Sequence, residues 1–152
     1  MWKSKGFGLL ELMVALVIVA LLATLAIPSY QRYADRARVT AAIGDIAKFE
    51  LAIESYRLRY NDRIPMNLAE LGIEVPLDPW GRAYQFLNIR AAGAGAIADF
   101  RKDGKLVPLN SDFDLYSLGK DGLTQAPLSA KDSRDDIVRA SNGAFIGLGE
   151  DY

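Results

Sequence analysis

The side chains that could do chemistry in this sequence are carboxylates, because the chain contains neither histidine nor cysteine. Zinc sites of the usual kind, histidine-based acid–base catalysis, thiolate nucleophiles and disulfides are therefore excluded. Two sets of carboxylates stand out by their surroundings. Glu11 lies alone in a long apolar run, and Asp121, Asp135 and Asp136 lie towards the C-terminus.

The C-terminal acidic set has the chemistry of a calcium site. Asp135 and Asp136 are adjacent like charges, which repel each other unless solvent or a cation neutralises them, and Asp121 lies beside a glycine in a predicted turn. A closed loop that brought Asp121 to this pair would call for a cation, and carboxylate and carbonyl oxygens suit calcium. The spacing lacks the glycine that an EF-hand loop requires. An ordinary solvated surface loop remains the alternative.

An apolar segment surrounds the first carboxylate. Residues 7–27 contain one charge, Glu11, and at about 1.5 Å per residue they could cross the hydrocarbon core of a bilayer, which is roughly 30 Å thick. Lys3 and Lys5 precede the segment, so the positive-inside rule puts the N-terminus in the cytoplasm. A carboxylate costs roughly 2.5–3.5 kcal/mol near the centre of a membrane, which makes Glu11 a candidate functional residue.

Two plainer interpretations of this segment stay open. One is a secretory signal peptide cut near Ala26, although the run exceeds the roughly 7–15 apolar residues of a signal-peptide core. The other is an ordinary transmembrane anchor. Neither gives Glu11 a purpose, because a carboxylate is costly in both kinds of segment.

The residues around Glu11 resemble the class III signal of type IV pilins and type II secretion pseudopilins. The match comprises basic residues, Gly6-Phe7, Glu11 four residues after Phe7, and an unbroken apolar run, whereas Gly8 departs from the hydroxyl residue often found there. The resemblance implies that a prepilin peptidase cuts after Gly6 and that Phe7 becomes a methylated N-terminus. It also implies that Glu11 neutralises the terminal amine of a neighbouring subunit in a filament.

The same resemblance implies the partners of the chain. They are further copies of itself in a helical homopolymer, minor pseudopilins or pilins, the prepilin peptidase and an inner-membrane assembly platform. The chain carries 18 Lys+Arg against 19 Asp+Glu, and such a near-neutral surface gives no reason to expect a nucleic-acid partner.

Beyond the apolar run the pattern changes to that of an amphipathic helix. Pro28 predicts a kink or local melting over residues 23–28. Apolar residues then recur every three or four positions, which predicts one buried stripe: Val39, Ile43, Ile46, Phe49, Ile53, Tyr56 and Tyr60. We therefore expect a leader over residues 1–6, a transmembrane assembly helix over 7–28, an amphipathic helix over 29–62 and a globular head over 63–152.

The head is predicted to be built of short strands and turns. A helical turn is expected over residues 67–71, a β-turn at Asp78-Pro-Trp-Gly81, and a hairpin turn at Asp103-Gly104. The expected strands cover residues 83–89, 96–101, 105–109 and 113–117. The fold class is thus α+β: a long N-terminal helix, with a transmembrane half and an amphipathic half, packed on a small antiparallel sheet with a C-terminal loop. This is the type IV pilin-like fold.

Two blocks of the head are similar to the major pseudopilin of type II secretion: Asp78-Pro-Trp-Gly81, and residues 113–122 with a later Asp-Asp-Ile. Those proteins bind a structural calcium ion in the C-terminal loop in place of a disulfide. The resemblance implies the following calcium ligands: Leu118, Asp121, Leu123, Ser133, Asp135 and Asp136. The stretch between Asp121 and Asp135 is longer than is expected for that family.

The sequence therefore predicts a structural subunit, not an enzyme, that supports protein secretion as part of a type II secretion pseudopilus. We expect a single pass through the bacterial inner membrane, with a cytoplasmic N-terminus and a periplasmic head, before the chain joins a filament. The alternative is a type IV pilus subunit that serves adhesion, twitching motility or DNA uptake. A membrane-tethered calcium-binding module that never polymerises is a further alternative.

Overall fold

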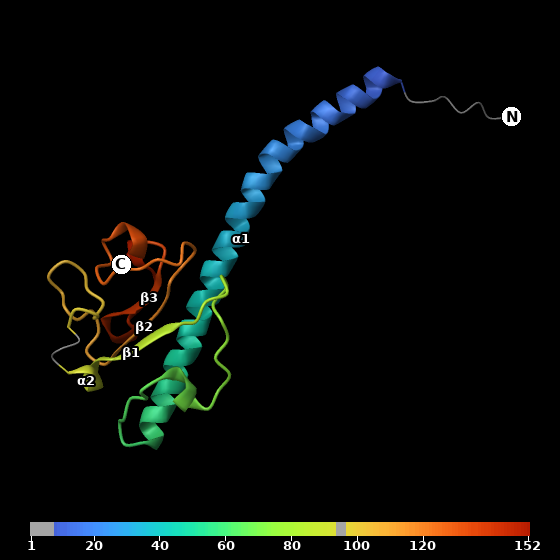
Figure 1. The fold of residues 1–152 in the computed structure, drawn as a ribbon. Helices are drawn as coiled ribbons and strands as arrows, with labels where there is room; N and C mark the ends of the chain where they lie inside the picture. Colours follow the sequence, from blue (N-terminus) through green and yellow to red (C-terminus); the bar gives the residue numbers. More distant parts are fainter. Residues whose placement is uncertain (1–7, 94–96) are drawn as a thin grey trace. The chain divides into compact units, whose positions relative to one another are not determined.

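The computed structural model describes residues 8–93 and 97–152, so the predicted cleavage residues Gly6 and Phe7 lie outside the described part. The chain divides into two units, Met1–Ala37 and Arg38–Tyr152, and each is described by itself. In chain order the elements are α1 (Leu9–Arg59), the 3₁₀ helix η1 (Leu68–Leu71), β1 (Gln85–Asn88), α2 (Ile89–Ala92), β2 (Phe113–Ser117), η3 (Lys131–Ser133), β3 (Ile137–Ala140), η4 (Ser141–Gly143), β4 (Phe145–Leu148) and η5 (Gly149–Asp151) (Figure 1).

The described part of the first unit is the beginning of α1. Its large apolar side chains are exposed, from Leu9 at 78% to Ile27 at 57%. A helix that is apolar on all sides is suited to a membrane or to the inside of an assembly, because it has no polar face to turn to water. By its length and composition, α1 could cross a membrane.

The helix continues through Pro28, so the predicted local melting is not seen. Hydroxyl side chains supply extra hydrogen bonds to carbonyls of the preceding turns: Thr24 Oγ1 donates to Leu21 O at 2.7 Å, and Ser29 Oγ donates to Leu25 O at 3.0 Å. Neither bond goes to Thr24 O, the carbonyl that loses its helical donor because Pro28 has no N–H.

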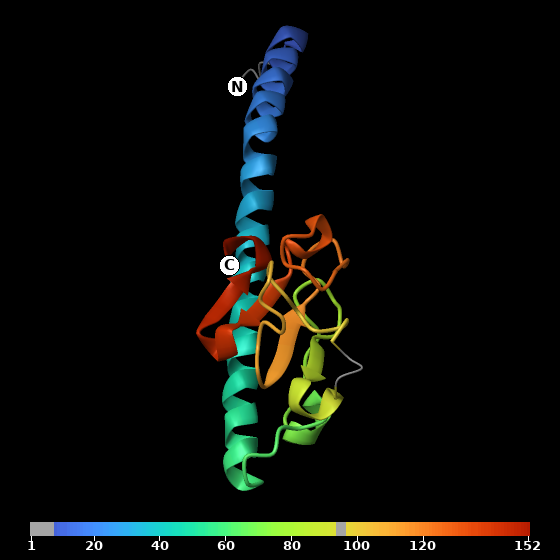
Figure 2. The same ribbon diagram turned by 90° about the vertical axis from the view of Figure 1, so that its left-hand side faces the viewer.

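The second unit contains a four-stranded antiparallel sheet in the order β1-β2-β3-β4. Figure 2 shows this sheet beside the part of α1 that belongs to the same unit. The registers are Gln85↔Tyr116 to Asn88↔Phe113 between β1 and β2, Tyr116↔Val138 and Ser117↔Ile137 between β2 and β3, and Ile137↔Leu148 to Ala140↔Phe145 between β3 and β4. The two central strands share only two residue pairs, so side-chain contacts must add to the pairing.

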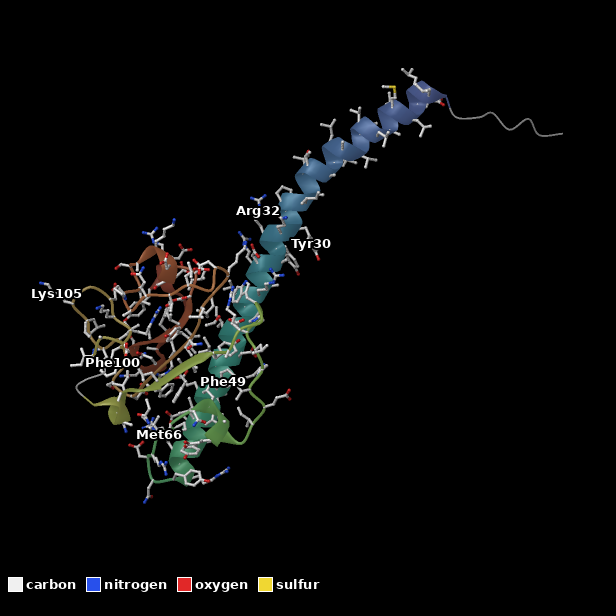
Figure 3. The ribbon with its side chains drawn as sticks, viewed as in Figure 1. Tyr30, Arg32, Phe49, Met66, Phe100 and Lys105 are labelled. Carbon is white, nitrogen blue, oxygen red and sulfur yellow. The ribbon has the colours of Figure 1, made fainter. Side chains whose placement is uncertain are left out.

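One face of α1 packs on the sheet and forms the core of the head. Phe49, which Figure 3 labels on α1, is 2% exposed, and its ring lies 5.1 Å from that of Tyr84 in an edge-to-face arrangement. The buried members of this cluster are Ala42, Ile46, Phe49, Ile53, Ile64, Leu68, Tyr84, Phe113, Leu115 and Ile137. The predicted stripe is confirmed from Val39 to Ile53, whereas Tyr60 is 49% exposed and lies beyond the end of α1.

A buried arginine ties α1 to the sheet. Arg139 on β3 donates from Nε to Glu50 Oε1 at 2.8 Å, and from Nη1 and Nη2 to the two oxygens of Asp112 at 2.9 and 3.0 Å. Its guanidinium carbon lies 3.9 Å from the centre of the Phe113 ring. Because removal of Arg139 would leave the buried carboxylate of Asp112 unpaired, this cluster constrains how helix and strand meet.

The strand predictions are partly wrong. Residues 113–117 form β2 as predicted, and the predicted strand over 83–89 shortens to β1. Residues 97–100 instead form turns, and 105–109 contribute only a single bridge, between Asp103 and Leu106 around Gly104. The predicted helical turn over 67–71 is confirmed as η1, whereas β3 and β4 were not predicted.

Replacement of Phe113 by alanine is expected to lower the free energy of unfolding of the head by about 3–5 kcal/mol, because this ring is fully buried. Leu58→Ala is the matched control, since Leu58 is 87% exposed, and it should change that free energy by less than about 0.5 kcal/mol. Urea denaturation followed by near-ultraviolet circular dichroism measures both. Equal losses in the two variants would contradict this description of the core.

Candidate functional site

The N-terminal candidate residue, Glu11, lies in the first turn of α1. Its Oε2 accepts a hydrogen bond from the backbone N–H of Gly8 at 2.9 Å, so the carboxylate folds back over the start of the helix. A negative charge is favourable there, because the first N–H groups of a helix have no partner within the helix. Glu11 is thus held at the end of the apolar segment.

The two head blocks found in the sequence contact each other. Asp78 is buried, and its Oδ2 accepts from Ser117 Oγ at the end of β2 at 2.6 Å. Its Oδ1 accepts from the N–H groups of Trp80 and Arg82, and Gly81 N donates to Asp78 O at 2.8 Å, which confirms the predicted turn. Arg82 then donates from Nη1 to Gly119 O at 2.7 Å. The turn therefore fixes where β2 ends and the acidic loop begins.

A tight turn over residues 118–122 opens the loop, and Asp135 caps it. Gly122 N donates to Leu118 O at 3.2 Å, which closes the turn. Asp135 Oδ2 accepts from the N–H groups of Lys120 and Asp121 at 2.7 and 2.9 Å. Asp121 Oδ1 accepts from Leu123 N at 2.8 Å within its own turn. Backbone N–H groups thus satisfy one oxygen of each carboxylate.

Asp136 lies in a second set of contacts, centred on Arg101. The Asp136 carboxylate is fully buried, and its Oδ2 accepts from Arg101 Nη2 at 2.7 Å and from Thr124 Oγ1 at 2.6 Å. Burial raises the pKa of the Asp136 carboxyl, and the hydrogen bond from Thr124 and the charge of Arg101 offset part of that rise.

Two of the remaining predicted ligands, Ser133 and Leu118, also have protein partners. Ser133 Oγ donates to Gln125 O at 2.7 Å and accepts from Gln125 N at 2.9 Å. This buried hydroxyl is therefore already engaged both as a hydrogen-bond donor and as an acceptor. Leu118 contributes its carbonyl to the turn described above.

As arranged here, these residues do not fit a calcium ion. Among residues 8–93 and 97–152, no group of three or more acidic side chains could hold a metal. Within the same ranges, one carboxylate oxygen of the set, Asp136 Oδ1, is buried without a hydrogen-bond partner. Calcium takes about six to eight oxygen ligands, so a single orphaned oxygen does not make a site. Calcium binding at this loop stays a prediction from the acidic residues of the sequence and from the resemblance.

Three residues that take part in the contacts of the acidic loop were not identified from the sequence: Arg82, Arg101 and Thr124. Arg101 and Asp136 are 35 positions apart, and Arg82 and Gly119 are 37 positions apart. No local spacing indicates such contacts, because arginines occur throughout the chain. The position of Arg82 directly after the Asp78–Gly81 turn was the only available signal.

Comparison with known proteins places the chain among secretion proteins. A family model described as the prokaryotic N-terminal methylation motif matches residues 3–27. The type II secretion system core protein G of Pseudomonas aeruginosa is 31% identical over 143 residues, covering 79% of this chain and 86% of that protein. The protein of the same name from Klebsiella pneumoniae is 31% identical over 142 residues, covering 79% of this chain and 99% of that protein.

Other similarity is confined to a shorter stretch. A fimbrial protein of Pseudomonas aeruginosa is 44% identical over 55 residues, which is 36% of each chain. No solved structure gave a match.

Substitution of Gly119 by alanine is expected to destabilise the loop strongly. Gly119 has φ of +61°, and an added Cβ would lie 2.1 Å from the backbone oxygen of Asp135. We expect a loss of about 2–4 kcal/mol in the free energy of unfolding, from the strained backbone and the overlap together. Gly104→Ala is the matched control, because Gly104 has φ of +52° with nothing within 4 Å of the added atom. If urea denaturation gave equal losses for both variants, the close approach to Asp135 would be refuted.

Proposed function

The chain belongs to the type II secretion system core protein G family, the major pseudopilins, and on this premise we propose that it is cut after Gly6 and polymerises through its N-terminal helix into a pseudopilus. The observation that carries the proposal is a family identity of 31% that extends over 79% of the chain, together with a methylation motif over residues 3–27. The motif covers the helix that would assemble, and the identity extends into the head. Nothing in this function requires an enzymatic site.

We propose that the chain resides in the bacterial inner membrane before it is assembled into the pseudopilus. Residues 7–28 would make a single pass, and Lys3 and Lys5 favour a cytoplasmic N-terminus with a periplasmic head. Residues 1–6 would then be the leader that the prepilin peptidase removes. The other partners are minor pseudopilins and an inner-membrane assembly platform.

We propose that Glu11 sets the axial register between neighbouring subunits in the filament. It is the only charge in an otherwise apolar segment, and a carboxylate surrounded by apolar helices is tolerated when an opposite charge pairs with it. Cleavage after Gly6 would create such a charge, the terminal amine of Phe7. We propose that Glu11 of one subunit pairs with this amine of its neighbour and so sets their axial offset.

The exposed apolar surface of α1 supports this use of the helix. Side chains such as Leu16, Val19 and Leu25 are 61–73% exposed in the single chain, so each has surface to bury when helices associate. Because lipid is as apolar as these side chains, close packing of the side chains between helices, and not transfer from water, would favour association. Membrane lipid would cover this surface before assembly and neighbouring subunits afterwards.

The test is to complement a deletion strain with Glu11 variants. Glu11→Ala is expected to lower secretion of the exported proteins by roughly tenfold or more, because loss of about 1.4 kcal/mol at each subunit contact is enough for a tenfold change in binding. Glu11→Gln keeps the shape but not the charge, and it should fail likewise. Protein released into the medium and cross-linked multimers of the chain are the readouts.

Glu54→Ala is the matched control, because Glu54 is an exposed carboxylate on the same helix whose salt bridge with Arg57 is also exposed. It should secrete at the level of the unaltered chain. Normal secretion and normal multimers with Glu11→Ala would contradict the proposed pairing. Loss of surface fibres with unchanged secretion in the deletion strain would instead support a type IV pilus subunit.

A further inference from the structure

A buried positive charge lies against Asp136, one of the six residues that were expected to bind a cation. Arg101 is 2% exposed and follows the buried Phe100, which Figure 3 marks within the head. Its guanidinium donates from Nη1 to Thr124 Oγ1 at 2.5 Å and to Gln125 O at 2.7 Å, and from Nη2 to Asp136 Oδ2 at 2.7 Å. One side chain thus binds a hydroxyl, a carbonyl and a carboxylate oxygen.

These three acceptors are of the kinds that a calcium ion takes in proteins. They come from both ends of the acidic loop, since Thr124 and Gln125 follow the turn after β2, and Asp136 immediately precedes β3. The arginine itself comes from the long connection between β1 and β2. It is further fixed by the bond from its own N–H to Asp114 Oδ2 at 2.9 Å, and its guanidinium carbon lies 4.5 Å from the centre of the Tyr116 ring.

We propose that the guanidinium of Arg101 is the structural cation of this loop, so that the head folds and holds residues 118–136 without calcium. The arginine neutralises Asp136 and joins the two ends of the loop, which are the tasks that a bound ion would perform. A guanidinium suits the position because it is always charged and its fixed donor fork can reach several oxygens at once.

The other acidic residues of the loop are stabilised without an ion. Asp135 Oδ2 accepts from two backbone N–H groups, and Asp121 Oδ1 accepts from one. Such N–H groups lower the repulsion between neighbouring carboxylates, because each places a partial positive charge at the oxygen. Asp136, which is buried, is the member that requires a full positive charge, and Arg101 provides it.

The experiment uses the full-length chain in detergent micelles and records the melting midpoint of the head by near-ultraviolet circular dichroism. Each protein is melted in EGTA and in about 5 mM CaCl₂, a concentration above the roughly 10⁻⁴–10⁻³ M at which extracellular calcium modules bind. The unaltered chain is expected to melt within about 2 °C in the two buffers, whereas a saturated site that stabilised the folded state would raise the midpoint by several degrees.

Arg101→Met keeps most of the apolar stem and removes the charge, which leaves Asp136 buried and unpaired. We expect the midpoint to fall by about 10 °C or more in both buffers. Arg134→Met is the matched control, because Arg134 is an exposed arginine of the same loop, and its midpoint should move by less than about 2 °C. The double variant Arg101→Met/Asp136→Leu should recover at least half of the loss, since no buried charge then remains unpaired.

A melting midpoint of the unaltered chain that rises with calcium would overturn the proposal. An Arg101→Met variant with the same midpoint as the Arg134→Met control would also overturn it. If Arg101→Met does not fold, calorimetric titration of the unaltered chain with CaCl₂ still decides: binding that raises the midpoint refutes the assignment, and no binding supports it. Melting of the purified chain requires no filament, so this result is independent of the proposed function.

Discussion

Burial of one face of α1 against the four-stranded sheet is the interaction on which the rest of the head depends. Ala42, Ile46, Phe49 and Ile53 are at most 2% exposed, and they meet Phe113, Leu115 and Ile137 from the sheet. Each strand has only four or five residues, and β2 and β3 share two residue pairs. Backbone pairing alone would leave so small a sheet marginal, so the helix supplies the surface that makes it stable.

Two buried arginines attach the loops to the core formed by α1 and the sheet. Arg139 joins α1 to the start of β2 through Glu50 and Asp112, and it covers the ring of Phe113. Arg101 joins the long connection after β1 to both ends of the acidic loop. Buried ion pairs add little net stability, but the loss of one partner is severe, so they favour one arrangement of the segments over others. A chain without cysteine can use such pairs where other small domains use disulfides.

The sequence indicated the features that have a local signature. A run of apolar residues and then a stripe at helical spacing predicted α1, and proline and glycine at fixed positions predicted the Asp78–Gly81 turn. The alternation in residues 113–117 predicted β2 with its observed bounds. β3 was missed because its four residues, Ile137–Ala140, are buried on both faces and show no alternation. The strand expected over 96–101 was wrong because Phe100 and Arg101 are buried by partners distant in the sequence, not by strand pairing.

The central claim is that this chain is a processed filament subunit, and the intact mass of the protein tests it most directly. The chain would be expressed in a host with a prepilin peptidase and in the same host without one, and then purified from the membrane fraction. We predict that the peptidase removes Met1 to Gly6 and that the mature chain, which begins at Phe7, carries one added methyl group. An uncut chain in both hosts, or a cut near Ala26 that removes the apolar segment, would contradict the account.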